Sequence, residues 1–492
     1  MSTQGVLTLT APHGTVTVPT GLFIAGEWRQ SSTGTTFDVV NPSDETVLGK
    51  IADATPSDAV AALDAATSAQ QEWGNLTSRE RSNFLRRVYE LLTERSEDIA
   101  WVMSAEMGKP LAESRGEVAG SAAIFRFLSE QVTQQRGTFS EAPNGGFRII
   151  TTHSPVGPSY LITPWNFPLL MGARKVGAAL AAGCTAILKP AALTPLSSHL
   201  FVQVLIDSGA PAGVINLVST SSSSSQSKAL MADERLRKIS FTGSTQVGST
   251  LLEQAAPNIL STSMELGGNG PFLVLANADV KKAAKDAVIA KFRNAGQVCV
   301  AANRIIVDKS IADEFRTEFI RQVEKLRVGA ADKQDTEIGP LVDANQRESV
   351  QKVLLEAVRD GAELLCGGQK IDQAGFYMEP TVISGARRNS RISTDEIFGP
   401  VASIYEADGV NDAIQFANDT RFGLVAYLYT ENTAEAISVA ERIESGIVAI
   451  NRPVVADPAA PFGGIKASGL GKEGGENGIR EYQVEKYIAL AV

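Results

Sequence analysis

One of the three cysteines in the chain, Cys299, lies in the stretch "AKFRNAGQVCVAANR", residues 290–304. A free cysteine usually packs as a small hydrophobic side chain, but this one is predicted to lie on a connection. The apolar stripe in residues 280–293 indicates a helix, Asn294-Ala295-Gly296 ends it, and a strand resumes near Arg304. A thiolate is a strong nucleophile that attacks carbonyl carbons. Cys299 is therefore a candidate nucleophile, and a buried structural thiol is the alternative.

Two other stretches carry side chains that suit carbonyl chemistry. In "MELGGNGPF" (264–272), two glycines follow Glu265 at once and let backbone or ligand come close, so a partly buried Glu265 could be a general base. In "ITPWNFPLL" (162–170), two prolines rigidify the loop around Asn166, and a held amide can donate to a developing oxyanion. Taken alone, a surface turn at Glu265 and a capped turn at Asn166 are the simpler interpretations.

A further stretch, "FTGSTQVGS" (241–249), indicates a strand that runs through a Gly-Ser-Thr turn into a helix. The exposed N–H groups at such a helix start suit a pyrophosphate. Lys189, at the end of the strand "TAILKP", could meet a ribose hydroxyl or a phosphate. The stretch is not the G-x-G-x-x-G fingerprint, so by itself it does not establish a dinucleotide site.

The composition disfavours several classes of function. The 492 residues are 43% hydrophobic and 20% charged, an ordinary globular composition, long enough for roughly two or three cores. A formal net charge of −10 disfavours nucleic acid or an anionic membrane as partner, because it repels phosphates. Three cysteines cannot build a disulfide framework and fit a reducing compartment. No secretory signal and no apolar run of ~18–20 residues is found, so we expect a cytoplasmic protein without a membrane span, and we expect no metal site.

The elements that must position these residues form a first α/β alternation. "GLFIAGEWRQ" (21–30) indicates a hairpin, and residues 57–132 have a helical pattern that starts at a capping Ser57. Short β-branched runs then alternate with helices at 172–182 and 195–207, which is typical of a parallel, doubly wound sheet. The predicted strands are 159–165, 185–191, 214–220, 238–244 and 271–277.

A second alternation follows, with a seam between the two domains near residue 266. The predicted helices are 279–293, 310–326, 343–360 and 409–418, and the predicted strands are 304–308, 363–366, 401–407 and 446–450. Cys299 thus lies at the seam, where ligands tend to bind in α/β proteins. We expect residues 1–22 to form a loose or partly extended arm, and the serine run 219–227 to be a solvated loop rather than a phosphate site.

The order of the stretches along the chain is more specific than any one of them. "TPWNFPL", "FTGST", "ELGGN" and "GQVC" are followed by "EIFGP" (396–400) and "PFGGIKASGLGKEGG" (461–475). Together they resemble the aldehyde dehydrogenase superfamily, from about residue 22 to the C-terminus. The resemblance implies a Rossmann-type cofactor domain (1–135 and 156–266), an α/β catalytic domain (267–465), and bridging or oligomerisation segments (136–155 and 466–492). Homodimers or homotetramers are usual in the family.

The resemblance also implies a role for each candidate residue. Cys299 attacks the aldehyde carbon to give a thiohemiacetal, whose oxyanion is held by the Asn166 amide and the backbone N–H of Cys299. Hydride transfer to the nicotinamide leaves a thioester, and Glu265 activates the water that releases the acid. Cys184 and Cys366, near predicted strand ends, are expected to be structural. The positions that match cofactor contacts are Pro164, Trp165, Lys189, Gly243, Ser244, Gly248, Glu396 and Phe398.

The residues after Lys189 bear on the choice of cofactor. NAD-preferring relatives often carry a glutamate in "KPxE" that binds the adenosine ribose, whereas "KPAALTP" places Ala192 there. Without that carboxylate, a 2′-phosphate meets no like charge, and Lys189 can pair with it. We therefore expect NADP to be accepted and preferred, with NAD as the other cofactor.

The substrate class follows from "MGARKVGAALAAGC" and "KFRNAGQVC", which look most like the succinate-semialdehyde dehydrogenases. In that subfamily, arginines at the positions of Arg174 and Arg293 bind the distal carboxylate, which guanidinium pairing suits. The alternatives are a solvated helix face for Arg174 and a cation at a helix end for Arg293.

The chain also departs from that subfamily. In the loop before "PFGG", Ala456 and Asp457 replace the usual serine, with an additional Arg452 nearby, and an inward Asp457 would repel an anion. Ala301 excludes the paired-cysteine redox switch found in some members.

We therefore expect oxidation of a small aldehyde, in the first place succinate semialdehyde to succinate, or glutarate semialdehyde to its acid. A broader aliphatic or aromatic aldehyde dehydrogenase is the near alternative, because the small Ala456 leaves room for a bulkier group. A non-catalytic structural or binding protein on this scaffold is the remote alternative. A CoA-acylating enzyme is disfavoured, since such enzymes lack the glutamate that stands here as Glu265.

Overall fold

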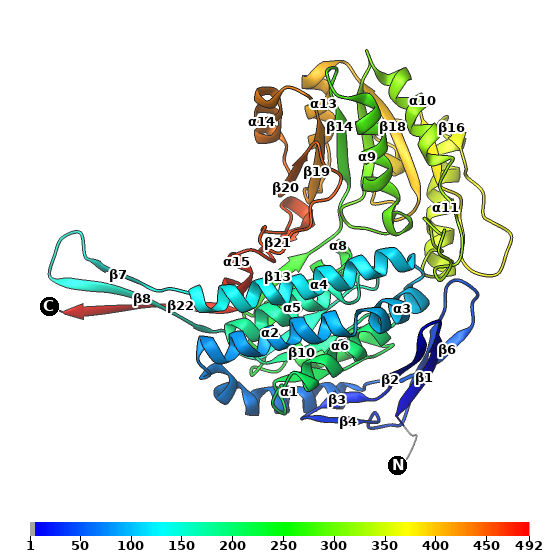
Figure 1. Ribbon diagram of the computed structural model, residues 1–492. Coiled ribbons are helices and arrows are strands. Elements are labelled where there is room, and N and C mark those ends of the chain that lie inside the picture. Colours follow the sequence, from blue (N-terminus) through cyan, green and yellow to red (C-terminus); the bar gives the residue numbers. More distant parts are fainter. Residues whose placement is uncertain (1–4, 492) are drawn as a thin grey trace.

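Two large sheets organise the molecule (Figure 1), which is seen in a computed structural model that describes residues 5–491. The first sheet has eight strands in the order β21-β13-β12-β9-β10-β11-β3-β4. Strands β9 to β13 are mutually parallel, as a doubly wound sheet requires. The bounds are β3 (Leu22–Ile24), β4 (Glu27–Arg29), β9 (Ser159–Ile162), β10 (Ala186–Lys189), β11 (Ile215–Leu217), β12 (Lys238–Thr242), β13 (Ser261–Glu265) and β21 (Gly469–Leu470).

Helices cover this sheet and bury its apolar side chains in two clusters. They are α1 (Pro56–Gly74), α2 (Ser78–Glu94), α3 (Ser96–Met107), α4 (Leu111–Gln131), α5 (Leu170–Ala182), α6 (Leu196–Asp207), α7 (Ser223–Met231) and α8 (Thr245–Ala255). Helices α4 and α5 pack against each other, which brings the segments before residue 131 next to the loop that carries Asn166. In Figure 1 this half of the molecule lies below the half formed by the second sheet.

The second sheet has seven strands in the order β16-β17-β18-β15-β14-β19-β20, and all are parallel except the edge strand β16. Its strands are β14 (Gly270–Val274), β15 (Ala302–Asp308), β16 (Glu363–Cys366), β17 (Thr381–Ser384), β18 (Val401–Ala407), β19 (Val425–Tyr429) and β20 (Ile447–Ile450). Its helices are α9 (Val280–Phe292), α10 (Ala312–Val323), α11 (Ala344–Arg359), α12 (Arg391–Thr394), α13 (Gly409–Asn418) and α14 (Thr433–Arg442). The chain passes from the first sheet to the second between β13 and β14, so the seam lies at residues 266–269.

A third sheet projects from the body of the molecule in Figure 1. It has three antiparallel strands, β7 (Thr138–Glu141), β8 (Phe147–Pro155) and β22 (Gln483–Ala491), and the short helix α15 (Asn477–Arg480) precedes β22. Large apolar side chains are exposed on it: Phe139, Val484, Tyr487, Ile488 and Leu490.

Most of the predicted elements are confirmed. The 21–30 hairpin forms with Ala25 and Gly26 in the left-handed region, at φ of 56° and 90°. The predicted helix 409–418 is α13, and the predicted strand 363–366 is β16. Periodicity predicts such elements well because each buries one face.

Three local expectations are wrong. Residues 1–4 lie outside the described residues. Beyond them, the segment expected to be a loose or partly extended arm is extended but not loose: it forms an antiparallel pair, β1 (Val6–Ala11) and β2 (Gly14–Pro19), which buries apolar side chains against β5 (Thr36–Val40) and β6 (Val47–Ala52). Helix α1 is capped by Thr55 rather than Ser57, because Thr55 and Asp58 form a reciprocal capping box. The serine run is not wholly a loop, since α7 begins at Ser223 and buries Gln226 and Ser227.

No helix within residues 5–491 combines the length and apolarity needed to cross a membrane.

Candidate active site

The loop that carries Cys299 has an unusual backbone. Helix α9 ends at Phe292, and the next residues Asn294, Ala295 and Gly296 all have positive φ, at 52°, 54° and 73°. For Asn and Ala this left-handed conformation is strained, and such strain persists only where surrounding contacts hold it. Cys299 follows on this turn, half-buried, before β15 begins at Ala302.

Two glycines allow the motifs to meet around this loop. A side chain at Gly268 would lie 2.3 Å from the Cys299 carbonyl oxygen, and one at Gly296 would lie 2.1 Å from the Gly399 carbonyl oxygen. Any Cβ at these positions would force the backbones apart. The "ELGGN", "GQVC" and "EIFGP" stretches are therefore packed backbone to backbone.

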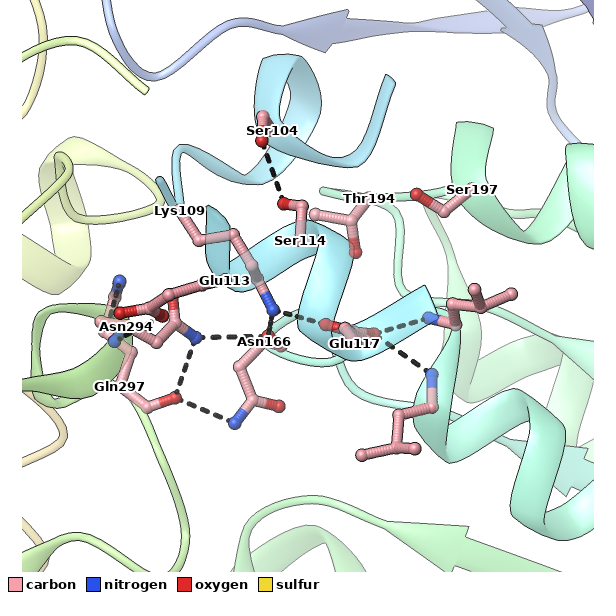
Figure 2. Close-up of polar contacts among 12 residues, drawn as sticks. Ser104, Lys109, Glu113, Ser114, Glu117, Asn166, Thr194, Ser197, Asn294 and Gln297 are labelled. Carbon is pink, nitrogen blue, oxygen red and sulfur yellow. Dashed lines mark hydrogen bonds and ion pairs between the residues drawn. The ribbon is translucent and has the colours of Figure 1, made fainter. Parts of the chain in front are cut away.

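The Asn166 amide lies against the same loop (Figure 2). Asn166 is 4% exposed, and its Nδ2 donates to the Gln297 carbonyl oxygen at 2.8 Å. The backbone carbonyl oxygen of Asn166 accepts from Lys109 Nζ at 2.6 Å and from Asn294 Nδ2 at 3.1 Å. The Nδ2 group has a second hydrogen, which remains for another acceptor. The Asn166 side-chain amide is thus held against the backbone of Gln297, two residues before Cys299 in the chain.

Glu265 ends strand β13 in a buried position. It is 3% exposed, and neither carboxylate oxygen has a hydrogen-bond partner in the described part of the protein. A side chain at Gly463 would lie 2.7 Å from Oε1, so the C-terminal segment closes over it. Burial, and then the neighbouring Glu473 charge, raise the pKa of Glu265 well above its ordinary value. A carboxylate with a raised pKa is a stronger base, which is what abstraction of a proton from water or a thiol needs.

A buried ion pair beside Glu265 is the part of the site that the sequence analysis missed. Lys175 Nζ donates to Glu473 Oε1 at 2.5 Å and to Ser240 Oγ at 2.9 Å. The Lys175 charge acts against the rise in the Glu265 pKa. The available signal was Glu473 among the glycines of "GLGKEGG", but nothing local pairs it with a lysine 298 residues away.

The surroundings of Cys299 keep its thiol protonated. Burial, followed by the charges of Glu396 and Glu265, raises the pKa of the Cys299 thiol to about 12, and Arg174 and Arg293 oppose the rise. Reaction therefore requires a base to take the thiol proton. The Glu265 charge acts on the thiol, and the raised pKa of Glu265 suits this task.

A cavity of about 330 Å³ opens onto Cys299 and contains both predicted arginines. Arg174 is 6% exposed, so the interpretation as a solvated helix face is wrong. Its Nε and Nη1 have no hydrogen-bond partner in the described residues, and its Cζ lies 4.3 Å from the centroid of the Phe462 ring. Arg293 is half-buried, with Cζ 5.7 Å from the Phe167 ring centroid.

The loop at the mouth of this cavity contains Ala456 and Asp457, both exposed. The Asp457 carboxylate turns onto its own loop, because Oδ1 accepts from the Ala459 N–H at 2.8 Å. Arg452 is exposed and is not one of the residues that line the cavity.

The residues predicted to contact a nucleotide lie at the carboxyl ends of the parallel strands of the first sheet. Lys189 ends β10 and is buried, while Ser244 caps α8 by accepting from the Val247 N–H at 3.3 Å. Thr163 and Thr242 follow or end β9 and β12, and their buried hydroxyls have no partner in the described residues. Orphaned hydroxyls beside a helix start fit the phosphates of a dinucleotide. Gly243 and Gly248 flank that helix start, where side chains would collide with Phe241 and Leu266.

The residues expected to hold the nicotinamide end of such a ligand lie at the seam. Glu396 Oε1 accepts from the Gly268 N–H at 3.1 Å, and burial raises the pKa of Glu396 to about 7. Phe398 has a positive φ of 52°, and its ring meets the Trp165 ring edge-on at 5.2 Å between centroids. Trp165 follows Pro164, and both are half-buried. The residue set therefore fits NAD(P)+ from the helix start to the thiol.

Comparisons with known proteins agree with this arrangement. Residues 28–488 match the aldehyde dehydrogenase family. A succinate-semialdehyde dehydrogenase of Paenarthrobacter nicotinovorans is 48% identical over 445 residues, which cover 90% of this chain and 99% of that protein. A glutarate-semialdehyde dehydrogenase of Pseudomonas putida is 40% identical over 470 residues, covering 96% and 97%. The crystal structure of an NADP-dependent enzyme of E. coli superposes with a TM-score of 0.95 at 39% identity, covering 96% and 98%.

Proposed function

The chain belongs to the aldehyde dehydrogenase family and is an NAD(P)+-dependent aldehyde dehydrogenase, and we propose that its substrate is a short aldehyde with a distal carboxylate, in the first place succinate semialdehyde. One observation carries the proposal. The cavity at Cys299 contains a buried guanidinium, Arg174, whose Nε and Nη1 have no hydrogen-bond partner among the described residues. Buried N–H donors without acceptors are costly, and a ligand that brings acceptor oxygens, such as a carboxylate, is expected to complete them.

Arg174 and Arg293 bind the carboxylate of the substrate, and its aldehyde carbon then faces Cys299 across the same cavity. Two guanidinium groups match the planar acceptor of a carboxylate. The relatives that act on succinate and glutarate semialdehyde support a substrate of this kind and leave its chain length open. Asp457 also lines this cavity, and its Oδ1 accepts from the Ala459 N–H of its own loop.

The chemical step uses Cys299, Asn166 and Glu265. Glu265 takes the thiol proton as the sulfur bonds to the aldehyde carbon, and the carbonyl oxygen becomes an oxyanion that accepts from Asn166 Nδ2 and the Cys299 N–H. NAD(P)+, when bound, accepts a hydride and so supplies the oxidation. Glu265, after giving up its first proton, takes another from the water that attacks the resulting thioester. The carbon–sulfur bond breaks, the acid leaves, and the free sulfur recovers a proton.

The residues that hold the cofactor in this proposal are Pro164, Trp165, Lys189, Gly243, Ser244, Gly248, Glu396 and Phe398. We propose that NADP is preferred to NAD. Burial lowers the pKa of Lys189 to about 8, and Ala192 leaves the neighbouring position without a carboxylate. A 2′-phosphate would supply a negative charge to pair with the Lys189 ammonium group.

The proposal extends to assembly and location. The exposed apolar strand β22 and the sheet it forms with β7 and β8 suit pairing with a second copy of the chain, as a homodimer or homotetramer. The segments 136–155 and 466–492 would form this contact, while 1–135 with 156–266 and 267–465 form the cofactor and catalytic domains. Three free cysteines, one of them the nucleophile, favour the reducing cytoplasm.

The test is the appearance of reduced nicotinamide absorbance with succinate semialdehyde, glutarate semialdehyde, propanal and benzaldehyde, each with NADP and with NAD. We expect kcat/KM to be highest for one of the two semialdehydes with NADP. Equal or better rates with propanal and benzaldehyde would favour the broader aldehyde dehydrogenase, in which the exposed Ala456 loop admits neutral groups. Equal or better use of NAD would refute the cofactor preference.

A further inference from the structure

We propose that Lys109 and Glu117 are positioning residues that fix the Asn166 amide against the nucleophile loop. Lys109 lies on the connection between α3 and α4, and Glu117 lies in the second turn of α4. Their side chains are fully buried, with Lys109 Nζ 2.5 Å from Glu117 Oε2. A buried ion pair adds little net stability compared with apolar side chains of similar size, so a role in geometry is the better account of the pair. This inference rests on the proposed role of Asn166 as oxyanion donor.

The ion pair forms hydrogen bonds with both ends of the loop 166–170 (Figure 2). Lys109 Nζ donates to the Asn166 carbonyl oxygen at 2.6 Å and lies 4.0 Å from the Phe167 ring centroid. Glu117 Oε1 accepts from the N–H groups of Leu169 and Leu170, at 2.9 and 3.0 Å. The ion pair thus uses its remaining hydrogen-bonding capacity on the backbone of one five-residue loop.

The same turns of α4 also hold the nucleophile loop. Glu113, one helical turn before Glu117, accepts from the Asn294 N–H at 2.8 Å through Oε2. Asn294 Nδ2 then donates to the carbonyl oxygen of Asn166 that Lys109 also contacts. The start of α4 is therefore a common support for the strained turn before Cys299 and for the oxyanion amide.

Loss of this support has a specific chemical consequence. Without Lys109, the backbone carbonyl oxygen of Asn166 loses one of the two hydrogen bonds described above and retains the one from Asn294 Nδ2. The backbone of Asn166 can then rotate, and its side chain moves with it. A displaced oxyanion donor weakens the transition state and leaves the thiol itself intact. Misplacement by about 1 Å can cost about 100-fold in rate, so we expect kcat to fall by about 10- to 100-fold, with a smaller change in KM.

The test compares K109M and the double variant K109M/E117Q with the full-length wild type. K109M leaves the Glu117 carboxylate buried without its cation, which can destabilise the fold. The double variant avoids this unpaired charge, because glutamine is uncharged, and its side-chain oxygen still accepts from the N–H groups of Leu169 and Leu170. S114A is the matched control: Ser114 lies in the first turns of α4 and is buried, and among the described residues its hydroxyl accepts from Ser104 Oγ at 2.8 Å. We expect S114A to keep the wild-type kcat.

Three readouts separate positioning from general structural damage. The first is kcat and KM for the preferred aldehyde. The second is the alkylation rate of Cys299 by iodoacetamide, which forms no oxyanion and is expected to stay within about 3-fold of wild type. The third is a double-mutant cycle with N166A. In the N166A background, K109M should lower kcat by less than about a further 3-fold, because the effect of Lys109 on kcat passes through Asn166.

The outcomes are distinguishable. Unchanged kcat in both Lys109 variants, or a parallel fall of kcat and alkylation rate, would overturn the positioning role. An equal loss on K109M in wild type and in N166A would do the same. If N166A itself keeps full activity, it is the proposed role of Asn166 that fails, whatever the Lys109 variants do.

Discussion

Replacement of Arg174 by glutamine is the perturbation that bears most directly on the substrate. The guanidinium is 6% exposed, and its Nε and Nη1 are the two donors that no described protein group uses. Glutamine keeps much of the side-chain volume against Phe462 and removes the charge. We expect R174Q to lower kcat/KM for succinate semialdehyde much more than kcat/KM for propanal.

The magnitude follows from the two free donors. A hydrogen bond to a charged group contributes about 1.5–3 kcal/mol, and loss of one partner of a buried charged contact costs about 2–5 kcal/mol. Some of this is offset because the substrate carboxylate also loses hydration and because half-buried Arg293 still faces it. A net loss of about 3 kcal/mol corresponds to about 100-fold in kcat/KM, at about 1.4 kcal/mol for each factor of ten.

The assay is reduced-nicotinamide absorbance with both aldehydes at one pH, and the ratio of their kcat/KM values is the result. The ratio matters because Arg174 also lowers the pKa of Glu265, so its removal changes the base for either aldehyde. R452Q is the matched control, since Arg452 is an exposed arginine a few residues before the cavity loop in the sequence. We expect R452Q to change the ratio of kcat/KM values by less than about 2-fold, because exposed charges are screened. An equal fall for both aldehydes in R174Q would refute the reasoning and make Arg174 a structural cation.

The other predictions concern the thiol, the base and the cofactor. C299A should abolish aldehyde oxidation while binding of NADP, measured by fluorescence titration, stays within about 2-fold, since the variant removes only the nucleophile; measurable turnover would contradict the assignment. E265Q should lower kcat by about 100- to 10,000-fold and also slow the alkylation of Cys299, because glutamine cannot take a proton; wild-type alkylation would limit Glu265 to the water step. In E265Q, where no carboxylate assists, alkylation of Cys299 should accelerate up to about tenfold for each pH unit from about pH 6 to 9, because the pKa of the thiol, about 12, lies above that range; a plateau near neutral pH in this variant would contradict the raised pKa. The KM for NADP should rise relative to that for NAD above pH 8, because the pKa of Lys189 is about 8 and the lysine loses its charge as the pH rises; parallel pH profiles would place the 2′-phosphate elsewhere.

Local patterns in the sequence predict the two α/β alternations and their seam. Strands and helices that bury one face repeat apolar residues with their own period, and α13 and β16 have the bounds that this periodicity predicts. Where the pattern is interrupted by polar residues it misleads. The Thr-rich sequence of β1 and β2 looks like a loose or partly extended arm, although alternate residues of these strands pack into a core. The serine run looks like a loop, although α7 begins within it.

The candidate chemistry was also accessible from the sequence, because a thiol, a carboxylate and an amide in distinctive stretches are visible without coordinates. Their environments were not. The burial of Arg174 beside Phe462 and the raised pKa of the Cys299 thiol both depend on neighbours from distant segments. A residue type indicates what a group can do, whereas desolvation and neighbouring charge decide its protonation.

The sequence by itself therefore determined most of the elements of the two α/β alternations and which side chains are available to react. Only the tertiary structure decided how they are held: Lys175 pairs with Glu473 across 298 residues, and Lys109 reaches the Asn166 carbonyl oxygen across 57. The physical reason is that secondary structure follows from interactions within a few residues. A buried ion pair or a shared carbonyl oxygen forms only when packing excludes water around groups that the local pattern does not relate.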